Sequence, residues 1–532
     1  MAAAALPITA ILYKIFRRTP LASIAGPPSQ SWLLGNVLEL AQGAAGEVPY
    51  AWKQRYGSVI KYKGPFGEDR LMVSDPKALQ HIFNTSSHDF CKPKESLVFL
   101  YELSGPNIVA VEGEAHRRQR KIILPAFGPS EIRALFPVFQ EVGQQLVSKW
   151  QNMIGDQKSI EINVNNWLSR AALDAVGQAG FNYTFGAIDD AQTELGKAYN
   201  NLAVDTASTQ AYGKALLDAI ISNLPPVIMA SMFRYFPAQW LSRIREAKRT
   251  AYKVAKQLVV KAQEVEAGTS RHDIMSLLVK ANASEESKSR LSDEELYAQM
   301  SVMLLAGHET TATSLSWALW VLAGHKDVQH RMRQEILAAE DDARSQGEAS
   351  LSLTQVEKLP YFQAVLKESM RLHPAIFQNF RVAARDVVVS LSKPVMSASG
   401  VPVNEVAIPA GTRIVTSYSC YNRDKDIWGD DANEFKPERW LSESETPAQG
   451  LSLGVVGHLM NFGTGGRTCV GWRFAMAEMQ CFLLELVKNF EFDIDPKKEI
   501  VKIGDIVAIP VVVGEEEKGA QLPLYVSLVP RR

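Results

Sequence analysis

The sequence has few cysteines and almost no net charge, and each of these two shortages excludes a class of protein. Four cysteines in 532 residues cannot make the disulfide framework of a small secreted protein, and no two have Cys-x-x-Cys spacing. The formal net charge of -1 provides no whole-chain field that would attract nucleic acid. With 46% hydrophobic and 22% charged residues, the composition is that of a globular protein.

The N-terminus, residues 1–24, has the composition of a short membrane anchor. Residues 1–16 are mostly apolar and are followed by Arg17 and Arg18. As a helix this stretch would be about 24 Å long, which is shorter than the hydrocarbon core of a bilayer at about 30 Å. Because the basic pair follows the apolar run, the positive-inside rule keeps the rest of the chain in the cytosol. A frayed N-terminus without a membrane role is the alternative.

After the anchor, the Pro-rich residues 25–31 predict a hinge, and residues 32–532 predict a single catalytic domain. The spacing of apolar residues indicates a mainly α-helical fold with a minor β region. Helical spacing dominates residues 131–278, and a capping box at Ser292–Glu295 precedes a long apolar helix that extends to about Gly324. We expect a further helix from Pro360 to His373-Pro374, and short strands within residues 59–73, 387–389 and 401–415.

An apolar segment at residues 219–241 interrupts the helical spacing at Pro225-Pro226. Such a segment either belongs to the core or forms a loop that contacts a membrane or gates substrate entry.

The strongest chemical signal is a single cysteine in a glycine-rich loop. Cys469 lies in the sequence FGTGGRTCVG, residues 462–471, which precedes an apolar helix. Glycines let backbone N–H groups approach the sulfur, and these groups and the helix N-terminus favour a thiolate. A nucleophilic cysteine would need a histidine base, and nothing marks the nearest preceding histidine, His458, as that partner. An axial haem ligand needs one thiolate and no second protein ligand, so this use fits better.

This decamer resembles the signature of the haem-thiolate monooxygenases, the cytochromes P450, which reads F-x-x-G-x-R-x-C-x-G. The matching positions are Phe462, Gly465, Arg467, Cys469 and Gly471. The resemblance covers nearly the whole chain and is strongest to microsomal eukaryotic members, fungal ones in particular. It implies the P450 fold, with haem b between the long central helix and the helix after the cysteine loop, and with Cys469 as the iron ligand. It also implies the endoplasmic reticulum membrane, with the catalytic domain in the cytosol.

The central helix contains Ala306-Gly307-His308-Glu309-Thr310-Thr311. A threonine hydroxyl can compete for the backbone carbonyl one turn earlier and loosen a helix locally. Close packing at a helix crossing is the alternative explanation. The resemblance makes this stretch the oxygen-binding groove, in which Thr310 hydrogen-bonds the oxygen and Glu309 supplies protons. His308 is expected to face away from that groove.

Glu368 and Arg371 have the spacing of an ion pair on one helix face. The same Glu-x-x-Arg spacing recurs at residues 114–117 and 246–249, so the spacing alone does not single out a structural pair. In the family, however, this motif is paired with a later Pro-Glu-Arg segment, here 437–439. The resemblance therefore implies a buried network of Glu368, Arg371 and Arg439 that braces the cysteine loop.

The two haem propionates need cations and hydrogen-bond donors. The resemblance assigns this role to Arg120, Arg381 and Arg467, and it places Phe462 beside the cofactor. His116 stands where the family commonly has tryptophan, and histidine can still donate a hydrogen bond. The neighbouring Arg117, Arg118 and Lys121 are expected to form an exposed basic face that docks an acidic redox partner.

These features together predict a monooxygenase that inserts one oxygen atom from dioxygen into an apolar substrate such as a terpenoid, a fatty acid or an aromatic compound. The resemblance suggests fungal secondary metabolism or xenobiotic oxidation. The chain has no convincing dinucleotide fingerprint, so electrons are expected from NADPH through a separate cytochrome reductase, with a cytochrome b-type donor as a second source. Two alternatives stay open: a haem-thiolate isomerase or dehydratase acting on peroxides, and a non-catalytic haem-binding protein. The expected pocket segments are residues 99–108, 225–240, 303–306, 375–380 and 503–509.

Overall fold

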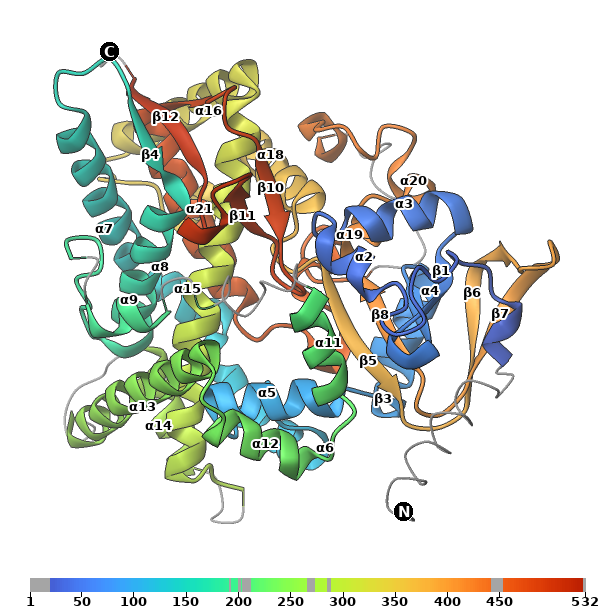
Figure 1. Cartoon of the computed structure of the whole chain (residues 1–532). Coiled ribbons are helices and arrows are strands. Elements are labelled where there is room, and N and C mark those ends of the chain that lie inside the picture. The colour runs from blue at the N-terminus through green and yellow to red at the C-terminus, as the bar shows by residue number, and fades with distance from the viewer. Residues whose placement is uncertain are drawn as a thin grey trace.

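The computed structural model describes residues 20–190, 193–199, 202, 212–265, 273–284, 289–441 and 453–529. Within these residues helices predominate and the strands form four small sheets, so the predicted fold class, mainly α with a minor β region, is confirmed. Figure 1 shows a helical part around α15 (Asp293–Ala323) and a smaller part in which the five-stranded sheet and the β6–β7 hairpin lie. The proposed anchor, apart from residues 20–24, lies outside the described residues.

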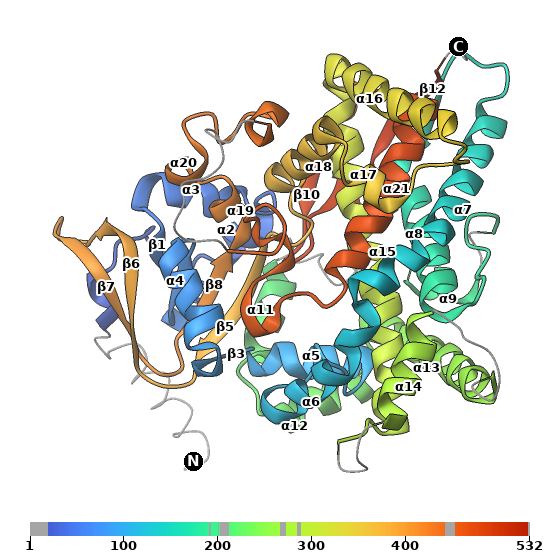
Figure 2. The ribbon, with the colours of Figure 1, turned by 180° about the vertical axis from the view of Figure 1, so that it is seen from behind.

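The long helix α15 runs through the centre of the helical part (Figures 1 and 2). It begins at the predicted capping box, in which Ser292 and Glu295 bond each other's backbone N–H groups, and it ends before Gly324, as predicted. It packs against α8 (Val164–Phe181), α13 (Gln239–Val265) and α21 (Trp472–Asn489). The predicted helix at Pro360 is α18 (Pro360–Leu372), and it ends just before His373-Pro374.

The described residues form further helices besides these five. They are α2 (Val37–Gln42), α3 (Glu47–Tyr56), α4 (Pro76–Gln80), α5 (Lys94–Ser104), α6 (Gly113–Ile123), α7 (Pro129–Ile154), α9 (Glu194–Tyr199), α11 (Tyr212–Ile221), α12 (Pro226–Tyr235), α14 (Ile274–Ser284), α16 (Lys326–Ser345), α17 (Leu353–Val356), α19 (Tyr418–Asn422) and α20 (Lys425–Trp428).

The five-stranded sheet has the order β1-β2-β8-β5-β3. Its first pair is the predicted hairpin within residues 59–73, and β8 joins β2 in parallel. The strands are β1 (Val59–Lys63), β2 (Asp69–Val73), β3 (Phe90–Cys91), β5 (Gln378–Ala383) and β8 (Arg413–Ser417).

The other sheets are smaller and were only partly predicted. The strand expected at residues 387–389 is longer, because β6 (Val387–Met396) pairs with β7 (Pro402–Ile408) along a bulged hairpin. The helical spacing over 131–278 did not reveal β4 (Ile160–Asn163), which pairs with β12 (Pro523–Leu528), itself paired with β9 (Phe490–Ile494). A last hairpin joins β10 (Ile500–Ile503) to β11 (Ile509–Val512).

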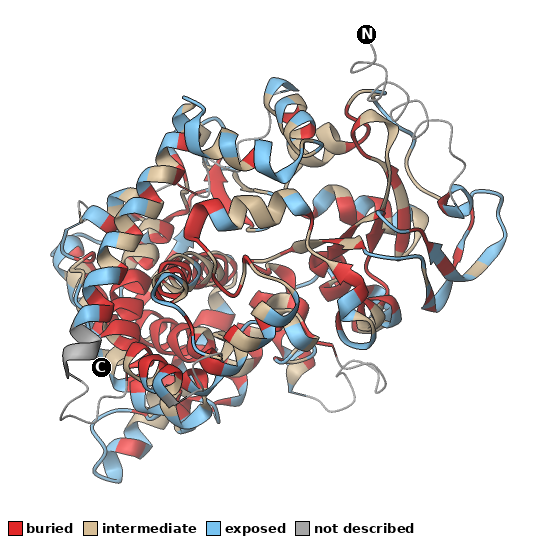
Figure 3. Ribbon diagram, turned by 90° about the horizontal axis from the view of Figure 1, so that it is seen from below, coloured by how far each residue is buried: buried red, intermediate tan, exposed pale blue. Residues whose placement is uncertain are grey.

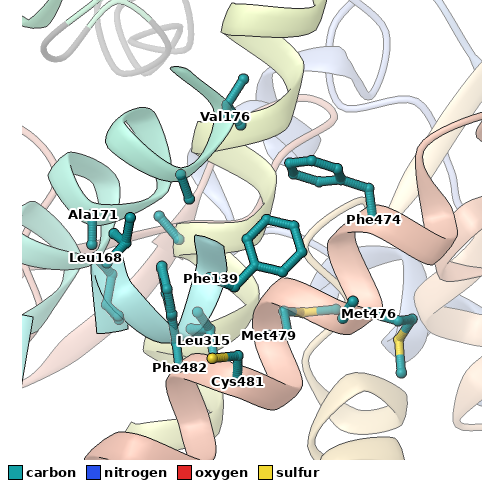
Figure 4. Close-up of a cluster of buried hydrophobic side chains, with 14 of the residues drawn as sticks. Phe139, Leu168, Ala171, Val176, Leu315, Phe474, Met476, Met479, Cys481 and Phe482 are labelled. Carbon is teal, nitrogen blue, oxygen red and sulfur yellow. The ribbon is translucent and has the colours of Figure 1, made fainter. Parts of the chain in front are cut away.

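The largest core lies where α7, α8, α15 and α21 meet, and buried residues fill the interior of this region in Figure 3. Figure 4 shows Phe139 of α7 and Phe474 of α21 side by side, and their ring centroids are 4.9 Å apart in an edge-to-face arrangement. Cys481 is buried in the same cluster, where it packs as a small apolar side chain. This core therefore fixes the helix that follows Cys469 against the central helix.

The apolar segment at residues 219–241 contains the end of α11, the whole of α12 and the start of α13, and only part of it is core. Met229 is buried, whereas Val227 is 77% and Tyr235 is 80% exposed. Helix α12 therefore presents an apolar face to the outside. Among the described helices no single one is long and apolar enough to cross a membrane. Two consecutive helical segments, Gly113–Phe127 and Pro129–Ile154, are together long and apolar enough to cross a membrane. They are bent by 57° where they meet.

Candidate active site

The cysteine loop is held by hydrogen bonds that the glycines make possible. The N–H of Cys469 donates to the carbonyl of Phe462 at 2.9 Å, and the Thr468 hydroxyl donates to the Gly465 carbonyl at 2.8 Å. Gly465 has φ +68°, and a Cβ there would lie 2.2 Å from the Phe83 carbonyl oxygen, so no other residue fits. The Phe462 ring is half-buried and packs at the edge of the main core.

Cys469 combines solvent exposure with a sulfur that protein atoms surround. The residue is exposed to solvent, yet burial raises the pKa of its thiol. The Gly471 N–H and the Arg120 charge act in the opposite direction but do not outweigh burial. The loop amide thus favours the thiolate, as the sequence predicted, while burial favours the thiol more strongly. A metal ion on the sulfur would displace the proton, because a coordinating thiol is deprotonated.

One residue of the oxygen-groove motif on the central helix is exposed as well. Ala306 is exposed although it lies in the middle of α15, between the buried Leu304 and His308. The Thr310 hydroxyl donates to the Ala306 carbonyl at 2.7 Å, which is the bond one turn back that the sequence predicted. Burial raises the pKa of Glu309 to about 7, so its carboxyl group is partly protonated at neutral pH.

Two other residues of this motif, Gly307 and His308, pack against neighbouring parts of the protein. A Cβ on Gly307 would lie 2.8 Å from a methyl group of Val176, so glycine lets α15 pack closely on α8. His308 is buried, has its Nδ1 2.6 Å from the Leu304 carbonyl and stacks on Tyr199, with ring centroids 5.4 Å apart. Burial lowers the pKa of His308 to about 4, so the ring is neutral at neutral pH. His308 thus lies where the sequence placed it, away from the groove.

Glu368, Arg371 and Arg439 are brought together as the resemblance implied. Arg371 binds both carboxylate oxygens of Glu368 at 2.8 Å, and Arg439 donates to one of them at 2.9 Å. All three side chains are at most 3% exposed. Glu368 also accepts hydrogen bonds from the Trp440 indole and the Lys436 backbone N–H.

The other guanidinium hydrogens of Arg371 reach backbone carbonyls of residues 422, 432 and 434. By contrast, the Glu114–Arg117 pair with the same spacing is an exposed surface pair, with side chains 85% and 72% exposed. Burial and full hydrogen bonding distinguish the structural pair from its surface counterpart.

The residues assigned to the propionates lie near one another around the cysteine loop. Arg120 donates to the Thr468 carbonyl at 2.8 Å, directly before Cys469. Arg467 pairs with Glu112 and reaches the Val111 carbonyl at 3.2 Å. Arg381 is 4% exposed and donates to the Asn379 side chain at 2.8 Å.

His116 is buried beside these cations. Burial lowers the pKa of His116 to about 3, and the charges of Arg467, Lys92 and Arg120 contribute. It therefore stands as a neutral hydrogen-bonding ring in a positive environment.

Lys92 is a further cation here, and no motif in the sequence indicated it. Its ammonium group donates to the Val109 carbonyl at 2.7 Å and lies 3.7 Å from Glu112. Burial and the neighbouring Arg467 lower the pKa of Lys92 to about 7. Because Lys92 comes from a different part of the chain than Arg467 and Glu112, only the fold brings the three together.

This donor set fits a haem. Among the described residues, Glu112 is the carboxylate that the structure pairs with Lys92 and Arg467, so the cluster carries excess positive charge. The pKa values of Arg381 and Arg467 are lowered mainly by burial, which shows that these charges are costly there. A ligand with two carboxylates would relieve that cost, and haem b has two propionates.

The chain has a lone cysteine just before a core helix, a central helix in which the Thr310 hydroxyl bonds the Ala306 carbonyl, and a buried cation cluster. Together these features define a haem-thiolate protein. The cytochrome P450 family model matches residues 25–513. Cytochrome P450 monooxygenase 205 of Postia placenta is 34% identical over 525 residues, which cover 96% of this chain and 93% of that protein. Cytochrome P450 monooxygenase claW of Ampulloclitocybe clavipes is 34% identical over 532 residues, which cover 97% and 94%. The chain belongs to the cytochrome P450 family and is a haem-thiolate monooxygenase.

Proposed function

We propose that this chain is a membrane-bound monooxygenase that oxidises an apolar substrate, with electrons that NADPH supplies through a separate reductase. The observation that carries the proposal is that Cys469 and Ala306 are both exposed, although Ala306 lies in the middle of the central helix. When bound, haem supplies the redox chemistry that activates dioxygen. Cys469 would hold its iron, and Lys92, His116, Arg120, Arg381 and Arg467 would hold its propionates.

The chain's own residues then deliver protons to the reacting oxygen. Glu309 holds a proton on its carboxyl group near neutral pH, and the Thr310 hydroxyl lies one residue further along the same groove. An acid next to an alcohol can pass protons toward the reacting oxygen. An isomerase or dehydratase that rearranges peroxides has no need of such proton delivery.

Turnover with different oxidants tests the proposal. Product should form with NADPH, a reductase and dioxygen. Product from a hydroperoxide alone, with none from NADPH and reductase, would instead favour the isomerase or dehydratase. Haem binding without product under either condition would favour a non-catalytic haem protein.

Replacement of Thr310 by alanine should uncouple electron use from product formation. We expect the variant to bind haem normally but to release reducing equivalents as hydrogen peroxide, with product formation lowered about 100-fold. The measurement compares NADPH consumed, peroxide released and product formed. Thr313→Ala removes a buried hydroxyl one turn further along α15 and should stay coupled. Unchanged coupling in Thr310→Ala would contradict the proposed role.

The pKa of Glu309 near 7 predicts a pH dependence of coupling. A raised pKa means that the carboxyl group keeps its proton up to about pH 7 and loses it above. Because only the protonated form donates, the peroxide share should rise as the pH increases through about 7. Glu309→Gln removes the titrating group and should flatten this dependence in the same assay. A peroxide share that rises equally in Glu309→Gln would assign the pH dependence to another group.

The apolar face of α12 supports association with a membrane of the endoplasmic reticulum. Val227, Ile228, Tyr235 and Phe236 are each at least 48% exposed, and exposed apolar patches of this kind mark interaction sites. Together with an anchor at residues 1–24, this face would keep the catalytic domain at the cytosolic surface. A chain without residues 1–24 that carries Val227→Asp and Tyr235→Asp should leave the membrane fraction, and continued membrane binding would contradict the proposal.

The exposed basic face of α6 supports docking of the reductase, and a cytochrome b-type donor could use the same face. Arg117 and Lys121 are exposed there, while Arg120 of the same helix reaches the cysteine loop. A carboxylate-bearing partner on this face would lie behind the thiolate ligand.

A further inference from the structure

A buried polar network joins three parts of the protein: α6, the first turns of α15, and the loop at residues 105–112. Gln119 of α6 and Gln299 of α15 are both fully buried. The Gln299 amide nitrogen donates to the Gln119 amide oxygen at 2.8 Å. Two amides buried in this way cost free energy unless all their hydrogen bonds are made.

The remaining bonds of this pair hold the loop at residues 105–112. The Gln299 oxygen accepts the Ile108 N–H at 3.1 Å, and the Gln119 nitrogen donates to the Pro106 carbonyl at 2.8 Å. On its other side the same loop is held by Lys92 at the Val109 carbonyl and by Arg467 at the Val111 carbonyl. The loop therefore lies between the glutamine pair and two of the propionate cations.

The other end of the network reaches the surface of α6. Glu295 accepts from Gln119 at 3.0 Å, from Arg118, and from the Ser292 N–H as part of the helix cap. The Arg118 side chain is 29% exposed and lies on the helix that carries Arg117 and Lys121. A carboxylate of a docked partner can thus compete with Glu295 for Arg118, because both would use the same guanidinium group.

We propose that the Gln119–Gln299 pair transmits redox-partner docking on α6 to the loop at residues 105–112, so that partner binding and ligand binding at the haem influence each other. When Arg118 turns to the partner, Glu295 loses one donor and Gln119 gains freedom to shift. Gln299 then moves with Gln119, and with it the Ile108 end of the loop. The pair acts through the loop, so both glutamines are positioning residues.

A purely structural role predicts a different result. Replacing both members of a buried polar pair with apolar residues of similar volume is often close to neutral for stability. Leucines at both positions would keep most of the packing, but the Ile108 N–H and the Pro106 carbonyl would lose these partners, so the free energy of unfolding should fall as well. Transmission and a purely structural role can be told apart by measuring how partner binding changes the affinity for a haem ligand. Transmission predicts that each binding event changes the affinity of the other, whereas a loss of stability is not specific to either.

The test measures coupling in the holoenzyme. The Kd of 4-phenylimidazole, measured by its optical shift, is compared with and without a saturating soluble flavin domain of a reductase. We expect the partner to change this Kd by about fivefold or more in the natural protein. In Gln119→Leu/Gln299→Leu the ratio of the Kd values without and with the partner should fall to one, with haem content unchanged. Gln329→Leu in α16 removes an equally buried amide that makes three hydrogen bonds, and it should keep the natural ratio.

The inference rests on the proposed docking on α6, and the outcomes separate the two. If Arg117→Glu/Lys121→Glu leaves the partner's Kd unchanged, the docking site is wrong and the inference falls with it. If that variant weakens the partner while the double leucine variant keeps the natural ratio, the inference alone is overturned. Should the double leucine variant fail to fold, Glu295→Gln decides. It keeps a capping side chain and weakens the hold on Arg118, so the ratio should drop, and an unchanged ratio overturns the inference.

Discussion

Cys469→Ala should lose the thiolate spectrum of the protein and all of its oxygenation activity. The sulfur is the atom through which the chain would hold the haem iron, and alanine provides no ligand in its place. The neighbouring Gly471 cannot compensate, because it meets the sulfur through a backbone N–H, which is not a metal ligand. The measurements are the carbon monoxide difference spectrum after dithionite reduction and product formation with NADPH and reductase.

Cys481→Ala is the matched control for this variant. Cys481 belongs to α21, which begins directly after the cysteine loop, and it is buried in the main core. Its loss leaves a small cavity and should lower the free energy of unfolding by about 1 kcal/mol. The thiolate spectrum and turnover should persist. Oxygenation retained in Cys469→Ala would overturn the ligand assignment, whichever result the control gives.

The sequence revealed those parts of the site whose residues are close together in the chain. The cysteine loop is one short segment, so its glycines, Arg467 and Cys469 could be read together. The oxygen-groove motif lies within six consecutive residues, and its helix follows a capping box that fixes where the helix starts. The cysteine loop and the oxygen-groove motif can be read from the spacing of residues within one segment, without knowledge of tertiary contacts.

The parts that could not be predicted depend on contacts between distant segments. Lys92 joins the propionate cluster only because the fold places it next to Glu112 and Arg467. Glu295 was recognised as a helix cap, but its second role as the partner of Arg118 depends on how α6 crosses α15. For Cys469 the sequence indicated the dipoles that lower the pKa of the thiol but not the burial that raises it.

Glu368→Ala should abolish stable haem incorporation. The carboxylate receives two hydrogen bonds from Arg371, one from Arg439, one from the Trp440 indole and one from the Lys436 backbone. Alanine would leave two guanidinium groups buried without their counter-ion. Removing one partner of a buried pair costs about 3–5 kcal/mol, which is a large part of the about 5–15 kcal/mol that stabilises a folded protein. The measurement is the haem content of the purified protein, with the thermal midpoint as a second readout.

The surface pair provides the control for this result, since Glu114→Ala removes the acid of the same Glu-x-x-Arg spacing on α6. Both side chains of that pair are mostly exposed, so water replaces the lost contact and haem content should not change. Glu368→Gln separates charge from shape, because the amide keeps most of the volume but cannot neutralise Arg371 and Arg439. If burial of charge is the reason for the effect, Glu368→Gln should lose haem almost as fully as Glu368→Ala. Normal haem content in Glu368→Ala would mean that the cysteine loop is held in place without this network, by α21 and the core beneath it.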